Sequence, residues 1–201
     1  MANKDLLYLR IDDREAERLL GELAGKLRKK GKFESIIARA QNAALDTARA
    51  ETVRVIREEY NAPAGEIKKT MTVKKATKRT LQARLTLKGR MSVELAHYGA
   101  KEGRKGVIVK VLKSSRRGPI KPGGDLGIMQ TKKNKASATW ITKGHVYARV
   151  EGKKSPIMML WGPSFLSRLS ADENRDRIMA VATRRFEGTL KHFADQALLQ
   201  K

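Results

Sequence analysis

The chain begins and ends with apolar positions at helical spacing. The first pattern predicts a helix over residues 13–30. A second helix is predicted over residues 34–60, and it must end there because Pro63 follows and disfavours helical backbone before it. The last helix is predicted after Ser170 and Glu173, which have the form of a capping box. Both ends of the chain are therefore expected to be helical.

Small side chains dominate one face of the second predicted helix. That face consists of Ile36, Ala40, Ala44, Ala48 and Val55. Small side chains allow another element to approach closely, so we expect this helix against a sheet or a neighbouring subunit. Packing inside one subunit is the favoured alternative.

Between the helices the apolar period changes to two. Alternation over residues 81–88 and 91–96, joined by Gly89-Arg90, predicts a β-hairpin with one buried face. The later segments are predicted as follows: strands at 107–112 and 146–150, and long loops rich in Gly, Pro, Ser and Lys at 113–127 and 130–138. This order predicts an α+β fold in which N-terminal helices and a C-terminal helix pack on a mainly antiparallel sheet with long basic loops.

The length of 201 residues and an apolar content of 40% fit one domain with its own core. We expect a single domain over residues 1–201, divided into a helical part (1–63), a basic β-rich part (64–161) and a C-terminal helical part (162–201). The sequence contains neither a stretch apolar enough to span a bilayer nor the apolar segment of a signal peptide. Synthesis in the cytosol and no membrane contact are expected.

Positive charge is concentrated in the middle of the chain. The formal net charge is +23, and residues 64–154 hold 24 Lys and Arg against 5 Asp and Glu. Repulsion of this size destabilises a compact state unless anions lie nearby, so a polyanion or an acidic protein partner is predicted. The candidate contact residues are Lys74, Lys75, Lys78, Arg79, Lys113, Arg116, Arg117, Lys121, Lys132, Lys133 and Lys135.

The sequence carries no signature of base-specific recognition, such as a zinc finger, a homeodomain or the aromatic motif of RNA-binding sheets. Any DNA contact is therefore expected to be with the backbone and independent of sequence. Few aromatic residues accompany the basic runs, which argues against stacking on single strands. For each run, a solvated face or a surface that docks an acidic protein remains the alternative.

Motifs of catalysis are absent as well. The sequence has no Walker loop, no G-x-S-x-G, no H-E-x-x-H and no cysteine. His97, His145 and His192 are widely spaced and are expected as partly exposed side chains. We expect no enzyme activity, no cofactor and no metal site.

The most distinctive string is SPIMMLWGPS at residues 155–164. With the strand GHVYARVEGKK before it, this string resembles a pattern near the C-terminal end of the minor tail protein Z family of tailed bacteriophages. Three earlier stretches resemble that family's long second helix, the segment after it and the next strands, in the same order: ARAQNAALDTARAETVRVIREEYN, IKKTMTVKKATKRTLQARLTLKG and MSVELAHYGAKEGRKGVIVKVLKSSRRG. The likeness covers residues 33–168, and PIKPGGDLGIMQTKKNKASA departs from it by being polar and Gly-rich.

The resemblance implies a structural virion protein that completes the tail at its head-proximal end and enables head-tail connection. It implies a homo-oligomer, expected as a hexameric ring, beside the tail terminator, the tail tube and the head-completion proteins of the neck. It places the protein in the virion, and in the host cytoplasm during viral tail assembly. The basic surface would then lie near the DNA path. The alternative is a cellular protein that uses the same cations to bind nucleic acid without sequence preference.

The same string has two interpretations, which concern Pro156, Ile157, Trp161, Gly162, Pro163 and Ser164. Pro156 fits an edge strand, Gly162-Pro163 fits a turn, and Ser164 fits the N-cap of the following short helix. The favoured interpretation is structural: the string fixes the last strand to the C-terminal helix. In the other interpretation, Met158 and Trp161 belong to a subunit or tail interface, where Met and aromatic residues are enriched.

Overall fold

A computed structural model describes residues 13–87, 92–104, 106–114, 118–119, 136–150, 157–169 and 171–199. Helices and short antiparallel sheets make up these residues, which confirms the predicted α+β class. The described residues form two compact units: the first from those within segments 1–52, 71–88 and 170–201, and the second from those within segments 53–70 and 89–169. The sequence predicted a single domain over residues 1–201, with divisions at residues 63 and 161. The structure shows two units instead, and their limits lie at other residues.

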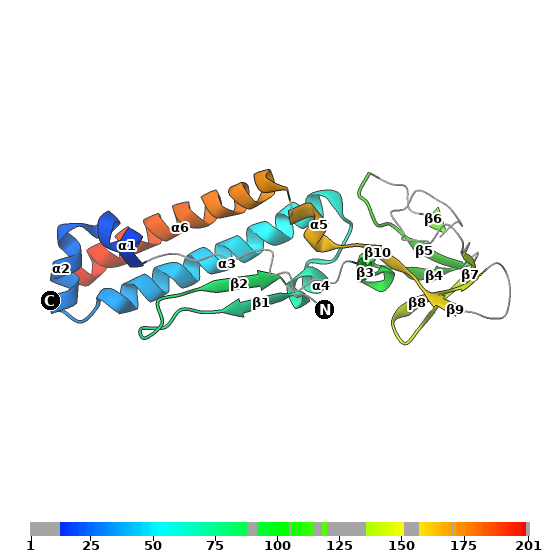
Figure 1. Ribbon diagram of the computed structural model, residues 1–201, viewed down its shortest axis with the longest axis horizontal. Coiled ribbons are helices and arrows are strands. Elements are labelled where there is room, and N and C mark those ends of the chain that lie inside the picture. The colour runs from blue at the N-terminus through cyan, green and yellow to red at the C-terminus, as the bar shows by residue number, and fades with distance from the viewer. Residues whose placement is uncertain are drawn as a thin grey trace. The chain divides into compact units, whose positions relative to one another are not determined.

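The first unit contains the two ends of the described chain. Its helices α1 (Asp13–Leu20) and α2 (Glu22–Lys29) both pack on α6 (Asp172–Leu199), as Figure 1 shows. The sequence predicted one helix over residues 13–30, and the structure corrects this. Gly21 separates the two helices because its φ of 49° lies in the left-handed region, where a right-handed helix cannot continue.

The long helix α3 (Phe33–Glu59) runs beside α6 in the first unit and confirms the second predicted helix. Its small-residue face is buried within the chain, and Ala40, Ala44 and Ala48 have no exposed surface. A buried carboxylate joins the two helices, since Glu51 is paired with Arg177 at 2.9 Å. The predicted packing of this face inside one subunit is therefore confirmed.

On its other side α3 is covered by a hairpin of β1 (Met71–Lys74) and β2 (Arg84–Leu87). The predicted hairpin of residues 81–88 with 91–96 is wrong, because β3 (Ser92–Glu94) pairs instead with β10 (Trp161–Pro163) in the second unit. Alternation shows that a strand has one buried face, but it does not specify which strand lies beside it.

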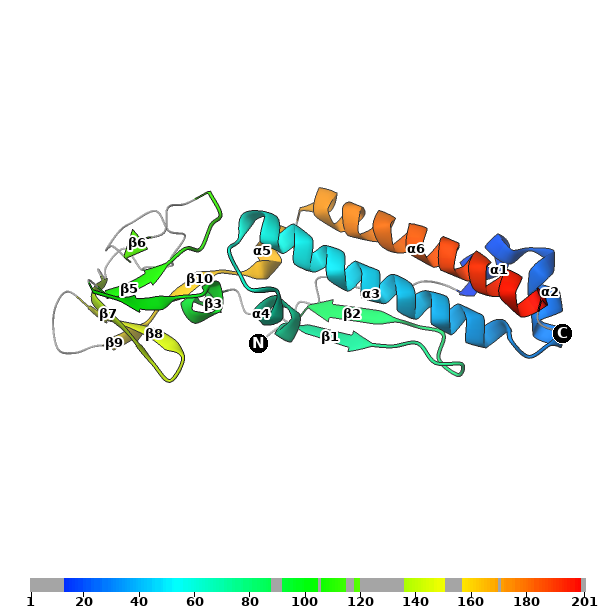
Figure 2. The same ribbon diagram turned by 180° about the vertical axis from the view of Figure 1, so that it is seen from behind.

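Short antiparallel strands build the second unit, and Figure 2 shows them from behind. The predicted strands at 107–112 and 146–150 correspond to β5 and β8, and β7 begins inside the predicted loop 130–138. The remaining elements of this unit are α4 (Ala64–Lys69), η1 (Leu95–Tyr98), β4 (Lys101–Gly103), β5 (Gly106–Val109), β6 (Gly118–Pro119), β7 (Ala136–Thr142), β8 (His145–Val150), β9 (Ile157–Met159) and α5 (Phe165–Leu169).

The predicted apolar stripe of the last helix is largely buried on α6, with Ile178, Phe186 and Ala194 fully buried. Ser170, the first residue of the predicted capping box, lies outside the described residues. None of the helices in the described ranges has an apolar stretch long enough to cross a bilayer.

Candidate nucleic-acid interface

Four of the predicted contact residues lie on the β1–β2 hairpin, two of them at its tip. Thr77 and Thr80 close the tip: the Thr77 N–H donates to the Thr80 carbonyl at 2.9 Å, and the Thr80 N–H donates to the Thr77 carbonyl at 3.2 Å. Lys78 and Arg79 are the two residues between them, and both are exposed. The turn therefore places two adjacent cations at the end of a hairpin.

Side chains of α3 hold the hairpin near this tip. Asn42 forms two hydrogen bonds with the backbone of Ala76: its Nδ2 donates to the carbonyl at 3.0 Å, and its Oδ1 accepts from the N–H at 2.8 Å. Gln41 Nε2 donates to the Leu81 carbonyl at 2.9 Å. These three backbone groups lie beyond the β1–β2 ladder and are satisfied by side chains of α3, which holds the hairpin close to its tip.

The hairpin cations differ in their surroundings. Lys75 lies 3.8 Å from the Asp46 carboxylate, so part of its charge is already balanced. Lys74, Lys78 and Arg79 are exposed, and within the described ranges no carboxylate is paired with them. We name the exposed cations Lys74, Lys78 and Arg79 the basic hairpin. These long side chains on one hairpin can contact successive phosphates of a polyanion.

Of the seven other predicted cations, the structure describes Lys113 alone. Lys113 belongs to the second unit, is exposed, and its backbone N–H donates to the Glu59 carbonyl at 2.8 Å. The remaining predicted contacts lie outside the described residues: Arg116, Arg117, Lys121, Lys132, Lys133 and Lys135.

The structure describes residues 157–164 of the distinctive string, which belong to the second unit. Pro156 lies outside the described residues, and Ile157 on β9 is 56% exposed. Gly162 and Pro163 belong to strand β10, so the predicted Gly-Pro turn is wrong. The predicted N-cap is confirmed, since Ser164 Oγ accepts from the Leu166 N–H at 3.1 Å at the start of α5.

Gly162 is needed because an aromatic cluster packs against it. A Cβ atom at this position would lie 2.7 Å from Cε2 of Tyr98, closer than side chains tolerate. Tyr98 is fully buried, its ring centroid lies 6.1 Å from that of Tyr60 and 5.5 Å from that of Phe165, and its hydroxyl donates to the Pro163 carbonyl. Burial raises the pKa of the Tyr98 phenol far above its usual value, so this group stays neutral and serves packing.

Trp161, the other aromatic residue of the string, is only half-buried. Its strand pairs with β3, with Trp161 opposite Glu94 in the register. Part of the indole thus remains accessible, whereas Gly162 and Ser164 are buried. The structural interpretation holds for these two buried residues, and the interface interpretation of Trp161 stays a prediction.

Two histidines are paired with carboxylates. His97 Nδ1 lies 2.5 Å from Glu66 Oε2, and His145 Nδ1 lies 2.5 Å from Glu94 Oε2. A hydrogen bond from Lys69 lowers the pKa of Glu66, with a further contribution from His97 against an opposing effect of partial burial. Each pair joins separate elements of the second unit. Among the described residues, no group of three or more acidic, histidine or cysteine side chains could hold a metal ion.

The sequence did not reveal an aromatic row on the β7–β8 sheet. Trp140 and Tyr147 are opposite one another in the register and stack with centroids 6.1 Å apart. The Arg149 guanidinium lies 5.9 Å from the centre of the Trp140 ring, a cation–π contact. Trp140 lies on β7, whereas Tyr147 and Arg149 lie on β8, and the antiparallel pairing of the two strands brings the three side chains together.

Comparison with known proteins finds no match to this chain: no family model, no curated protein and no solved structure. The resemblance to the minor tail protein Z family therefore stays a prediction.

Proposed function

We propose that this protein is a structural component of a phage neck, which completes the tail and enables it to join the DNA-filled head. The observation that carries the proposal is the ordered resemblance of residues 33–168 to the minor tail protein Z family. In this role the protein catalyses no reaction. It acts as a ring, expected to be hexameric, in contact with the tail terminator, the tail tube and the head-completion proteins.

The basic hairpin supports a position beside DNA. Its three exposed cations lie on one hairpin held by α3, two of them at the tip, and nothing in their arrangement selects a base. A whole genome passes through a phage neck, so contacts that recognised particular bases would hold the DNA at particular sites. Contacts with the backbone alone allow the duplex to slide. Cations that contact only the DNA backbone are therefore suited to a neck through which the genome must slide.

Deletion of the gene from a phage that encodes this chain tests the neck role. We expect lysates that contain filled heads and separate tails, seen by electron microscopy, with plaques restored by the gene in trans. Normal plaque formation by the deletion phage would exclude the proposal.

Charge variants of the purified chain test the contact between the hairpin and DNA separately. Lys78→Gln/Arg79→Gln removes the two tip cations, and Arg184→Gln/Arg185→Gln removes two exposed arginines of α6 as a matched control. For a short DNA duplex, the hairpin variant should lower the slope of log affinity against log salt by about 0.9 for each lost phosphate contact. The control should keep the wild-type slope. Equal slopes in both variants would remove the hairpin from the DNA contact.

A cellular nucleic-acid-binding protein remains the second candidate, because the same basic hairpin serves it equally well. That candidate predicts tight, salt-dependent DNA binding by a monomer. Sedimentation of the purified chain distinguishes the two: a ring supports the neck role, and a monomer that binds DNA supports the cellular role. Neighbouring capsid and tail genes would favour the first, and translation genes the second.

A further inference from the structure

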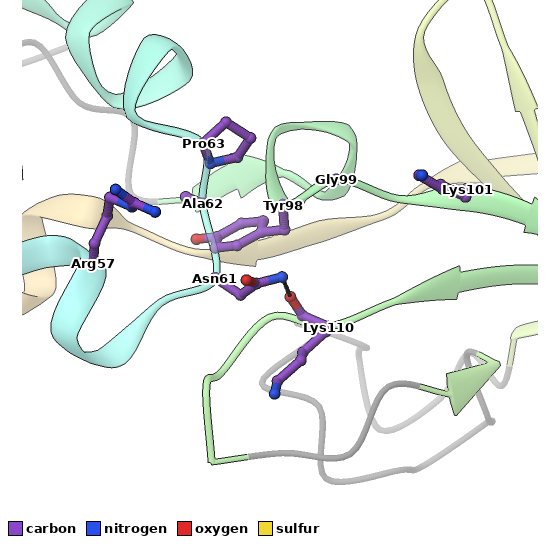
Figure 3. A pocket seen from close by; sticks show the side chains of 8 residues that line it. All are labelled: Arg57, Asn61, Ala62, Pro63, Tyr98, Gly99, Lys101 and Lys110. Atoms are coloured by element: carbon purple, nitrogen blue, oxygen red, sulfur yellow. Dashed lines mark hydrogen bonds between the residues drawn. The ribbon is translucent and has the colours of Figure 1, made fainter.

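A pocket of about 410 Å³ opens in the second unit, and none of the contact residues predicted from the sequence is among those that line it. Three of its lining residues are cationic: Arg57 in the last turn of α3, Lys101 at the start of β4, and Lys110 just after β5. None of its lining residues is acidic. Figure 3 shows Arg57 and Lys101 on opposite sides of the pocket, with Asn61, Tyr98 and Lys110 between and below them.

Hydrogen bonds fix the segments that carry these cations. The Asn61 backbone N–H donates to the Val111 carbonyl at 2.8 Å, and Asn61 Nδ2 donates to the Lys110 carbonyl at 3.2 Å, the bond drawn in Figure 3. The buried Tyr98 ring forms part of the wall. The end of α3 and the segment after β5 are therefore tied together, and Arg57 and Lys110 are held at one pocket.

Four described carboxylates of this unit have partners that do not line the pocket. Their partners are as follows: Glu59 with Arg168, Glu66 with Lys69 and His97, Glu94 with His145, and Glu102 with the Ile141 N–H. By contrast, within the described part of the chain no ion pair involves the charged groups of Arg57, Lys101 or Lys110. Three cations around one hollow repel each other, and an anion in the hollow would offset that repulsion.

We propose that this pocket binds phosphate groups, either free or in a nucleic-acid backbone. The Arg57 guanidinium offers a planar pair of donors that matches two phosphate oxygens, and the lysines add charge and further N–H donors. The pocket volume lies in the range of small-ligand sites, roughly 300–1,000 Å³, so a phosphate with an attached sugar can enter. Phosphate binding here does not require a role in a phage neck, so the titration below and the deletion phage can fail independently.

The test is a titration of the full chain with inorganic phosphate at constant ionic strength, followed by ³¹P line broadening. The pocket variant is Arg57→Gln/Lys110→Gln. The control is Lys68→Gln/Arg104→Gln, which removes one lysine and one arginine from exposed positions of the same unit that do not line the pocket. We expect the pocket variant to bind phosphate about tenfold more weakly, which corresponds to about 1.4 kcal/mol, and the control to bind as wild type.

Two further measurements complete the test. Circular dichroism establishes that each variant is folded, and Arg57→Lys, which keeps the charge but loses the planar donor pair, should give an intermediate affinity. A short DNA duplex added to the phosphate complex identifies the source: displacement of phosphate indicates a backbone site, and retention indicates a site for the free anion. Absence of phosphate binding, or an equal loss in the pocket variant and the control, would overturn the proposal.

Discussion

The two units achieve order in different ways. The first relies on long helices: α3 and α6 bury continuous faces, and Gln41 and Asn42 satisfy the hairpin backbone from the side of α3. The second unit consists mostly of strands of two to seven residues, which are too short to be stable alone. Its order comes from Tyr60, Tyr98 and Phe165 and from the His–Glu pairs. Local pattern therefore determines the first unit more fully, and side-chain packing between distant segments determines the second.

This difference can be measured because tryptophan fluorescence and circular dichroism report mainly on different units. Both tryptophans of the chain, Trp140 and Trp161, belong to the second unit, so their fluorescence reports on that unit. The far-ultraviolet circular dichroism signal comes mainly from helices, and α1, α2, α6 and most of α3 belong to the first unit. Denaturation followed by both signals tests each unit by itself.

The largest expected effect is that of Tyr98→Ala. Removing a fully buried ring from the aromatic cluster should destabilise the second unit by about 3–5 kcal/mol, seen as an earlier fluorescence transition. Tyr98→Phe, which loses only the hydroxyl bond to Pro163, should cost about 1 kcal/mol.

Phe186→Ala is the counterpart in the first unit, where the ring is also fully buried on α6. Phe186→Ala should lower the free energy of unfolding of the first unit by about 3–5 kcal/mol, as Tyr98→Ala does for the second unit. Here the earlier transition should appear in the circular dichroism signal. If Tyr98→Ala and Phe186→Ala shift both signals equally, the two units unfold together and the comparison fails.

The next largest effect is expected at Gly162 in the second unit. Gly162→Ala would place a Cβ atom 2.7 Å from Tyr98 Cε2 and 3.3 Å from Leu95 Cδ2, and this overpacking should cost about 1–3 kcal/mol by fluorescence-detected unfolding. Gly65→Ala is the matched control, since no atom lies within 4 Å of its added Cβ and the site is helical. The control should stabilise by about 0.5–1 kcal/mol. The same sign in both variants would show that Gly162 is not packed against Tyr98.

In the first unit, Asn42→Ala should cost about 1–3 kcal/mol, because it leaves the N–H and the carbonyl of Ala76 without partners. Urea denaturation followed by circular dichroism measures the change. Gln196→Ala, at an exposed position of α6, should alter stability by less than about 0.5 kcal/mol. A loss no greater than that of the control would mean that Asn42 does not hold the hairpin.

The smallest effect concerns pH. Because the pKa of Glu66 is lowered in the folded state, its contribution to stability is present above the unfolded value of about 4.3 and is lost as pH falls through the folded value. Wild type should therefore lose more stability than Glu66→Gln as the pH falls from about 5 to 3, by less than about 1 kcal/mol because the group is partly exposed. Thermal unfolding followed by tryptophan fluorescence gives the difference, and parallel pH profiles would contradict it.

The site was predicted only in part. Lys78 and Arg79 were singled out as contact candidates from charge alone, and the structure places both, exposed, at a hairpin tip. Arg57 and Lys110 were missed because they lie in separate elements and form no run in the sequence. Trp140 and Arg149 were missed for the same reason, since strand register brings them together.

By itself the sequence determined the long helices, the buried small-residue face of α3 and the capping role of Ser164, because spacing and capping act over a few residues. Only the tertiary structure decided that β2 pairs with β1 rather than with β3, that Gly162 lies in a strand against Tyr98, and that three cations line one pocket. These features depend on contacts between distant segments. Local periodicity contains no information on which distant surface completes a buried face.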